Sequence, residues 1–370
     1  MATGITTYQC PACTGPLHFV GESGKLECDY CGATYEVAEI EQLYREKEAA
    51  SVKAQTKADA DLHREKTAAE DMGMSWDAAE AAGMKAYNCP SCGAELICDA
   101  TTAATSCPYC GNPTVVPGQF TGGLKPELVI PFKLDKEAAV AALKQYYKGK
   151  KFLPRAFSEQ NHIQEIQGVY VPFWLCDCQV DGSATYHARN TRTWKEGDYE
   201  ITETDHYQVE RSGSIAFERI PVDASTKMPD AHMDAIEPYD YNDLRAFSSA
   251  YLPGFLADRY DVSQQDSLPR IQNRAQTSAK VELRNTVKGY DAVATENEDY
   301  QFRKSGMKYA LLPVWMLSTR WKDQNFLFAM NGQTGKLVGD LPVDKGKYLA
   351  WFAGIALPLM AAILGFWFFL

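Results

Sequence analysis

The chain has 370 residues and a net charge of −11, with 45% hydrophobic residues, 12% aromatic residues and 11 cysteines. This length suffices for two or three domains with a sizeable core, which excludes a wholly disordered chain and a disulfide-stapled miniprotein. The acidic balance argues against a protein built to bind phosphate backbones, because such proteins carry a basic footprint.

The first predicted element in chain order is a small β zinc ribbon at residues 1–37. Cys10 and Cys13 form one C-x-x-C pair, and Cys28 and Cys31 form a second pair after 14 intervening residues. Each pair makes a tight knuckle, and the intervening hairpin brings both knuckles around one tetrahedral ion. The spacing therefore predicts a structural Zn²⁺ site with four thiolate ligands.

The same pattern returns at residues 87–118, where Cys89, Cys92, Cys107 and Cys110 again enclose a 14-residue loop. We therefore expect a second ribbon and a second structural Zn²⁺ ion. Redox activity is the alternative for any single pair, but redox C-x-x-C motifs begin a helix in a βαβ unit. Full thiolate coordination leaves no open position for water, so the pattern does not favour a catalytic zinc.

Glycine follows three of the four knuckles directly, at Gly32, Gly93 and Gly111. A positive φ at these positions would turn backbone NH groups toward the sulfur atoms, and glycine adopts it without steric cost. We therefore expect left-handed backbone at all three.

Residues 38–86 are predicted to form a charged helical linker. The segment is rich in Ala, Glu, Lys and Asp and has no proline, which favours one long solvated helix over residues 38–71. Its apolar positions form only a thin stripe, so a charged spacer is the preferred interpretation and a dedicated coiled coil is the alternative.

Residues 119–344 are predicted to form an α+β domain. A helix is expected over Lys136–Tyr147 with Asp135 as its N-cap, and a second over Ser267–Val287. β-Branched and aromatic residues predict strands at Glu127–Leu134, Val169–Val180, Tyr199–Glu210, Ser214–Ile220, Lys308–Trp321, Phe326–Met330 and Lys336–Leu341.

A weak internal echo lies within this domain. The segments Tyr170–Leu175 and Leu311–Met316 both read apolar-apolar-Pro-apolar-Trp-apolar, 141 residues apart. The echo suggests two related αβ halves.

The final predicted element is a single transmembrane anchor at residues 345–370. Residues 348–370 hold no charged side chain, and a helix of that length reaches roughly 34 Å, against a hydrocarbon core of about 30 Å. A buried core helix is the alternative. With Lys345 and Lys347 before the segment and no N-terminal signal peptide, we expect a single-pass protein of the bacterial cell membrane with a cytoplasmic N-terminal body.

The scarcity of basic residues on the two ribbons indicates which class of partner they can bind. Residues 8–35 hold one basic residue, Lys25, and residues 86–118 hold none. Because a four-thiolate zinc centre adds about −2 formally, these surfaces should repel a phosphate backbone. The sequence therefore favours protein partners over nucleic acid.

Motifs for catalysis are weak. The segment Asn331–Lys336 resembles a phosphate loop, but Met330 and Leu337 break the G-x-x-x-x-G-K-[ST] pattern, so a polar hairpin turn is preferred. The six histidines are scattered singly, as His18, His63, His162, His187, His206 and His232.

Three cysteines lie outside the ribbon pattern. They are expected to be buried packing residues, with an extra metal or redox pair as the alternative for the last two, and they are Cys98, Cys176 and Cys178.

Five features of the chain, taken together, resemble a family of bacterial membrane-associated zinc-ribbon proteins. They are the CPxC…C(D/P)YCG ribbons, the charged segment between them, the PFW and LLPVW strands, the FAMNGQTGKLVG hairpin and the apolar tail. That family is often labelled TFIIB-type or primosomal-helicase-like. The resemblance implies a non-enzymatic membrane platform that works with phage-shock-type and SPFH-domain proteins in envelope stress. The eight ribbon cysteines match its zinc ligands, whereas the helicase label lacks its Walker motif here.

The leading hypothesis is accordingly a tail-anchored, non-enzymatic scaffold whose two zinc ribbons recruit cytosolic or membrane-associated proteins to the inner membrane face. A nucleic-acid-binding or regulatory zinc-ribbon protein is the alternative, and an enzyme housed in residues 120–343 is a third hypothesis.

Overall fold

The computed structural model divides the chain into two compact units. Unit 1 comprises Met1–Val171, Thr226–Arg259 and Leu311–Leu370, and unit 2 comprises Pro172–Ser225 and Tyr260–Ala310. The structure describes residues 10–12, 17–20, 25–28, 31–43, 45–46, 76, 78–99, 102, 106–112, 116–118, 124–154, 166–321 and 324–369.

The N-terminal ribbon is a three-stranded antiparallel sheet of β1 (Leu17–Val20), β2 (Lys25–Cys28) and β3 (Thr34–Tyr35). Helical residues 37–43 and 45–46 follow it. Ile40 from this helical segment is buried against the sheet residues Leu17 and Leu26. A small local core thus forms around the first cysteines.

The predicted long helical linker is not found among the described residues. The described helical residues in this part of the chain are 37–43 and 45–46, and the next described helix is the short α2 (Ala78–Ala82). Residues 47–75, which carry most of the prediction, lie outside the described residues.

The second ribbon is part of a much larger mixed sheet in the described chain. Its strands are β4 (Met84–Asn88), β5 (Glu95–Asp99) and β6 (Val116–Gly118). The sheet runs in the order β10-β7-β12-β8-β11-β5-β4-β6, and β13, β14 and β9 pair outside this path. The short strands are β7 (Leu128–Val129), β10 (Arg245–Ala246), β11 (Leu256–Asp258) and β14 (Leu337–Gly339).

Unit 1 has its core between α3 (Lys136–Tyr147) and the sheet. Asp135 caps α3 by accepting a hydrogen bond from the Ala138 amide, as predicted. The buried helix face packs against β12 (Ala292–Trp321) and β13 (Gln324–Asn331). The core side chains are Ala139, Val140, Leu143, Tyr147, Leu153, Ile166, Trp315, Leu317, Phe328 and Met330.

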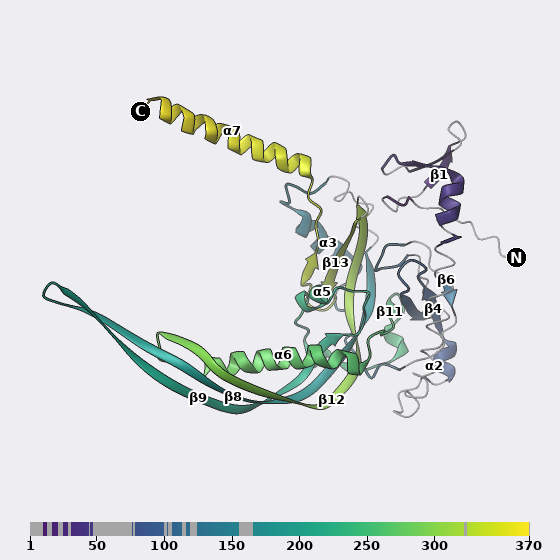
Figure 1. Ribbon diagram of the computed structural model, residues 1–370. Helices are drawn as coiled ribbons and strands as arrows, with labels where there is room; N and C mark the ends of the chain where they lie inside the picture. Colours follow the sequence, from purple (N-terminus) through teal and green to yellow (C-terminus); the bar gives the residue numbers. More distant parts are fainter. Residues whose placement is uncertain are drawn as a thin grey trace. The chain divides into compact units, whose positions relative to one another are not determined.

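Unit 2 is built from long strands and one long helix. Figure 1 shows β8 (Gln167–Glu196), β9 (Tyr199–Asp223) and β12 as extended, curved strands with α6 (Gln264–Asn285) lying along them. β8 and β9 form an antiparallel hairpin that keeps its register from Cys178↔Phe217 to Glu196↔Tyr199. The strands that the sequence predicted within β8 and β12 are each less than half as long as the observed strands. Where the structure has the single strand β9, the sequence predicted two.

The core of unit 2 lies between α6 and one face of these strands. Ile271, Ala275 and Ala279 repeat at a spacing of four residues and form the buried stripe of the helix. Alternate residues of β8 face them, since side chains alternate along a strand. These strand residues are Cys176, Cys178 and Val180. Further along β8, Ala184, Tyr186 and Ala188 pack with Leu283 and Val287.

The two echo segments lie on neighbouring strands, β8 and β12. Trp174 donates its indole NH to the carbonyl of Val262, and Trp315 donates to the carbonyl of Leu134. Both rings are buried. The repeated tryptophan therefore has the same role in each unit, which is to fill the core and tie a strand to a separate backbone segment.

The remaining elements are one short helix, two 3₁₀ turns and the last described helix. They are the short helix α5 (Asp230–Ala235), the 3₁₀ turns η2 (Tyr241–Asp243) and η3 (Ser249–Tyr251), and α7 (Lys345–Phe369). The beginning of α7 packs on unit 1, where the Phe152 ring lies 5.7 Å from the ring of Tyr348.

The predicted transmembrane anchor is contradicted. Across the described part of the chain, no helix combines the length and the apolarity that crossing a membrane requires. The expected single-pass membrane localisation and the tail-anchored topology depended on that segment, so these predictions are wrong as well. The predicted cytoplasmic placement of the body was derived from the same segment and loses that basis. The predicted fold class also underestimated the sheet, which links the second ribbon to the α+β region.

Candidate metal centres

The structure brings the four predicted ligands of the second ribbon together. The Sγ atoms of Cys89, Cys92, Cys107 and Cys110 all lie within 4.8 Å of one another. Cys89 Sγ is 3.6 Å from Cys110 Sγ, and Cys92 Sγ is 3.6 Å from Cys107 Sγ. We call this group centre 2.

Short backbone hydrogen bonds shape both knuckles of centre 2. The Gly93 amide donates to the Cys89 carbonyl at 2.9 Å, and the Gly111 amide donates to the Cys107 carbonyl at 2.9 Å. Gly93 and Gly111 each have φ of +69°. The predicted left-handed glycines are thus confirmed, and each lets the chain turn back around the sulfur atoms.

Centre 2 is joined to the sheet of unit 1. Strand β5, between its two knuckles, pairs with β11 in the register Ala257↔Ile97, and β11 pairs in parallel with the start of β8. Arg259 forms an ion pair with Glu95 at 3.1 Å, and both side chains are mostly buried. The backbone that carries the ligands is therefore held by long-range contacts as well as by the knuckles.

The thiols of centre 2 titrate as a group. Hydrogen bonds donated by the other three thiols, foremost that of Cys107, lower the pKa of Cys110 well below its usual range. Hydrogen bonding with Cys110 raises the pKa of Cys107. Four thiols packed this closely cannot all ionise unless a cation offsets their charge, which matches the needs of a metal site.

The first ribbon gathers three described ligands, Cys10, Cys28 and Cys31, also within 4.8 Å of one another. Cys10 Sγ lies 3.5 Å from Cys31 Sγ. The fourth predicted ligand, Cys13, lies outside the described residues. We call this group centre 1.

Centre 1 shares the knuckle geometry of centre 2. The Gly32 amide donates to the Cys28 carbonyl at 2.9 Å, and Gly32 has φ of +70°. The Tyr35 hydroxyl lies 3.6 Å from Cys10 Sγ, and burial together with this contact raises the pKa of Tyr35. The equal spacing in the sequence thus corresponds to equal local structure at the described knuckles.

Both clusters can hold a metal ion. Sulfur ligands about 2.3 Å from a tetrahedral ion lie about 3.8 Å from one another. The Sγ pairs at 3.5 Å and 3.6 Å are close to that separation, so the thiols need little movement to bind an ion.

The three other cysteines are buried, as predicted. Cys98 donates to the Thr102 carbonyl at 3.4 Å, and burial raises its pKa to about 11. Cys176 and Cys178 both lie in the core beneath α6, because residues two apart in a strand share a face. The register shift beside them adds one residue to β9, where Ile220 pairs with Cys176 and Phe217 pairs with Cys178. Burial raises the pKa of Cys176 to about 11, which disfavours the reactive thiolate.

The Asn331–Lys336 segment is a structural turn between β13 and β14, as the sequence indicated. Asn331 is fully buried, and its amide donates to the carbonyls of Ile236 and Pro238. Its side-chain oxygen accepts hydrogen bonds from the backbone amides of Gln333 and Thr334. These polar groups are used to hold backbone segments together.

Sequence reasoning missed one pair of histidines. His206 Nδ1 and His187 Nε2 share a hydrogen bond of 3.0 Å across β8 and β9. In the observed register His187 lies opposite Gln208 and His206 lies opposite Arg189, so the two rings are diagonal neighbours on one face of the hairpin. His232, by contrast, is buried in α5 with Nε2 at 3.2 Å from an Asp340 carboxylate oxygen.

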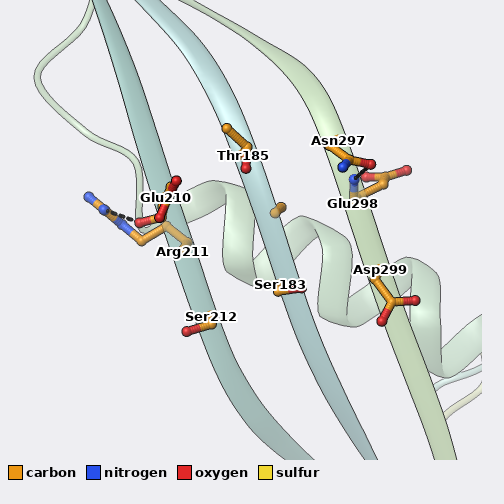
Figure 2. Close-up of a pocket in the computed structure, with 9 residues that line it drawn as sticks. Ser183, Thr185, Glu210, Arg211, Ser212, Asn297, Glu298 and Asp299 are labelled. Atoms are coloured by element: carbon orange, nitrogen blue, oxygen red, sulfur yellow. Dashed lines mark hydrogen bonds between the residues drawn. The ribbon is translucent and has the colours of Figure 1, made fainter.

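A shallow polar pocket of about 230 Å³ lies on the strands of unit 2. Figure 2 shows its side chains on three neighbouring strands, β8, β9 and β12. Its volume is below the roughly 300 Å³ at which ligand pockets begin, and its lining is polar. It is lined by Ser183, Ala184, Thr185, Glu210, Arg211, Ser212, Asn297, Glu298 and Asp299.

Comparison with curated proteins identifies a relative in Bacillus subtilis. The chain is 35% identical over 319 residues to the uncharacterized protein YdjG of Bacillus subtilis, covering 73% of this chain and 94% of YdjG. The chain belongs to the YdjG family. No family model matches the chain, and no solved structure matches it.

Proposed function

We propose that the protein is a non-enzymatic adaptor that holds two structural Zn²⁺ ions and binds a protein partner through its N-terminal ribbon. The observation that carries the metal-binding part of the proposal is centre 2, where four thiols lie within 4.8 Å of one another. Four sulfur ligands in tetrahedral reach favour zinc or an iron–sulfur cluster, and the paired knuckles are typical of structural zinc.

Closed coordination supports a structural role for the ions. Four cysteine ligands leave no position for a water molecule or a substrate, so the ions would stabilise the ribbons without taking part in a reaction. The chemistry that zinc supplies here is charge compensation for the thiolates, which allows the knuckles to close.

The surface of the N-terminal ribbon supports a protein partner. Phe19 on β1 is 60% exposed, and the basic Lys25 is paired with Glu36 at 2.9 Å. The helical segment that follows carries Glu39, Glu41 and Glu46. An exposed aromatic ring on a ribbon that is followed by a mainly acidic helical segment, in which Glu41 is paired with Arg45, fits a partner that presents an apolar side chain and basic residues.

The partners that the family resemblance implies are the first to test. Phage-shock-type and SPFH-domain proteins would be mixed with the zinc-loaded full chain and with its Phe19→Ser variant, and binding would be measured by calorimetry. We expect Phe19→Ser to weaken binding by roughly tenfold, as expected for loss of an aromatic anchor. Tyr199→Ser, which alters a residue 78% exposed at the β8–β9 turn, is the matched control and should leave binding unchanged.

Two results would refute this assignment. One is partner binding that is equally strong in wild type, in Phe19→Ser and in a Cys10→Ser/Cys13→Ser variant. The other is tight, salt-dependent binding of DNA or RNA by the same ribbon, which would favour the nucleic-acid alternative.

A further inference from the structure

The two cysteine clusters differ in the access of solvent to their sulfur atoms. In centre 1, Cys31 is exposed, whereas Cys10 and Cys28 are buried. In centre 2, none of the four ligands is exposed: Cys89 and Cys107 are buried, and Cys92 and Cys110 are partly buried. The equivalent positions Cys31 and Cys110, each the last ligand of its ribbon, therefore present different targets to a reagent in water.

We propose that Cys31 is an oxidation site for hydroperoxides and that its oxidation produces a Cys10–Cys31 disulfide. Oxidation of cysteine follows thiolate character and exposure, and a site of this kind needs a nearby second thiol to resolve the first product. Cys10 Sγ, at 3.5 Å from Cys31 Sγ, is placed to be that thiol. The proposal rests on the proposed function, because zinc binding is what keeps both sulfurs as thiolates.

The reaction balances with one hydroperoxide. Cys31 Sγ attacks a peroxide oxygen, the O–O bond breaks, and the displaced hydroxide takes up a proton, which leaves a sulfenic acid on Cys31. Cys10 Sγ then attacks Cys31 Sγ, so that the S–S bond forms, the S–O bond breaks and a second hydroxide takes up a proton. The two sulfurs lose two electrons, the peroxide gains them, and hydrogen peroxide yields two waters.

The consequence for the ribbon follows from its small core. Cys10 and Cys28 are themselves core residues, beside Leu17, Leu26 and Ile40. Zinc-dependent modules of this size depend on their ligands for folding. Oxidation of Cys31 would therefore unfold the ribbon that carries Phe19 and release the bound protein partner, while centre 2 stays intact.

The test uses the full chain loaded with two zinc ions. Hydrogen peroxide is added at one equivalent, zinc release is followed with a chromogenic chelator, and disulfides are mapped by mass spectrometry of unreduced peptides. We expect about one of the two ions to leave in a fast phase, together with a peptide pair linked through Cys10 and Cys31. Release from centre 2 should be roughly tenfold slower, because its sulfurs are shielded.

Matched variants separate exposure from mere loss of a ligand. Cys31→His keeps a zinc-binding side chain but removes the exposed sulfur, so it should bind two ions and lose the fast phase. Cys110→His makes the same change in centre 2 and should keep the fast phase.

Several outcomes would overturn the inference. They are equal release from both centres, a first disulfide that links other cysteines, and a fast phase that persists in Cys31→His. A chain that never binds zinc would instead refute the proposed function, so the two failures are distinguishable.

Discussion

At the scale of single residues, Gly93 shows how the knuckle constrains side-chain choice. It has φ of +69°, and a Cβ at this position would meet no atom within 4 Å. Substitution there is thus limited by backbone conformation and not by space. The same holds for Gly32, which has φ of +70° and equally open surroundings.

We therefore expect Gly93→Ala to destabilise the zinc-loaded knuckle by about 1 kcal/mol, the cost of left-handed backbone in a residue with a Cβ. Zinc affinity measured by chelator competition should fall accordingly. Gly93→Asn should recover part of the loss, since asparagine tolerates this conformation. Gly213→Ala is the control, because its Cβ also meets nothing and its φ is not positive. Equal affinity in Gly93→Ala and wild type would contradict the argument.

Asn331 is a second residue whose role is visible only in the fold. Its side chain makes four hydrogen bonds to backbone groups from a fully buried position. Asn331→Ala should lower the free energy of unfolding by about 3 kcal/mol, because buried polar groups lose their partners. Denaturant unfolding measures this. Asn297→Ala, at an exposed position, should change it little, and a similar loss in both variants would argue against the role given to Asn331.

At the scale of elements, the two ribbons differ in how they connect to the rest of the chain. Centre 2 is continuous with a sheet through β5 and β11, whereas β1, β2 and β3 form a separate sheet. Loss of zinc should therefore affect different regions.

Cys89→Ser/Cys92→Ser should accelerate amide hydrogen exchange in β11 and the start of β8 as well as in the second ribbon, because β5 loses its anchor. Cys10→Ser/Cys13→Ser removes the equivalent knuckle of the first ribbon and should leave β11 protected. Hydrogen exchange read by mass spectrometry resolves these strands. Unchanged protection of β11 in the first variant would show that centre 2 does not support the sheet.

Local signals were sufficient for some elements. Helix α3 begins and ends where the sequence predicted, because its N-cap Asp135 and its apolar period lie within one stretch of chain. The knuckle glycines were predictable for the same reason. The hairpin turn at Asn331–Lys336 also follows from its own residues.

Structure that depends on pairing between separate segments of the chain could not be predicted from local sequence patterns. The second half of β8, residues 181–196, consists largely of polar residues that look like loop and was not predicted as strand, yet cross-strand pairs such as Thr193–Thr202 and Arg192–Asp205 sustain the hairpin. The pairing of β5 with β11 joins residues about 160 positions apart, which no local pattern reveals. The membrane prediction relied on the charge-free run and its flanking residues, and no helix among the described residues meets the length and apolarity that it required.

At the scale of the whole molecule, the described residues show two metal-ready clusters, one with an exposed ligand and one built into a large sheet. The third hypothesis, an enzyme in residues 120–343, gains no support from the polar pocket on unit 2, which is small and shallow. The proposed function therefore depends on the two metal centres, and it requires that both bind a metal ion.

Native mass spectrometry of the full chain, with elemental analysis of the same sample, tests this claim most directly. The account predicts two zinc ions per chain, falling to one in Cys89→Ser/Cys92→Ser and to one in Cys10→Ser/Cys13→Ser. A wild-type chain without metal, or one carrying iron and sulfide at these cysteines, would contradict it.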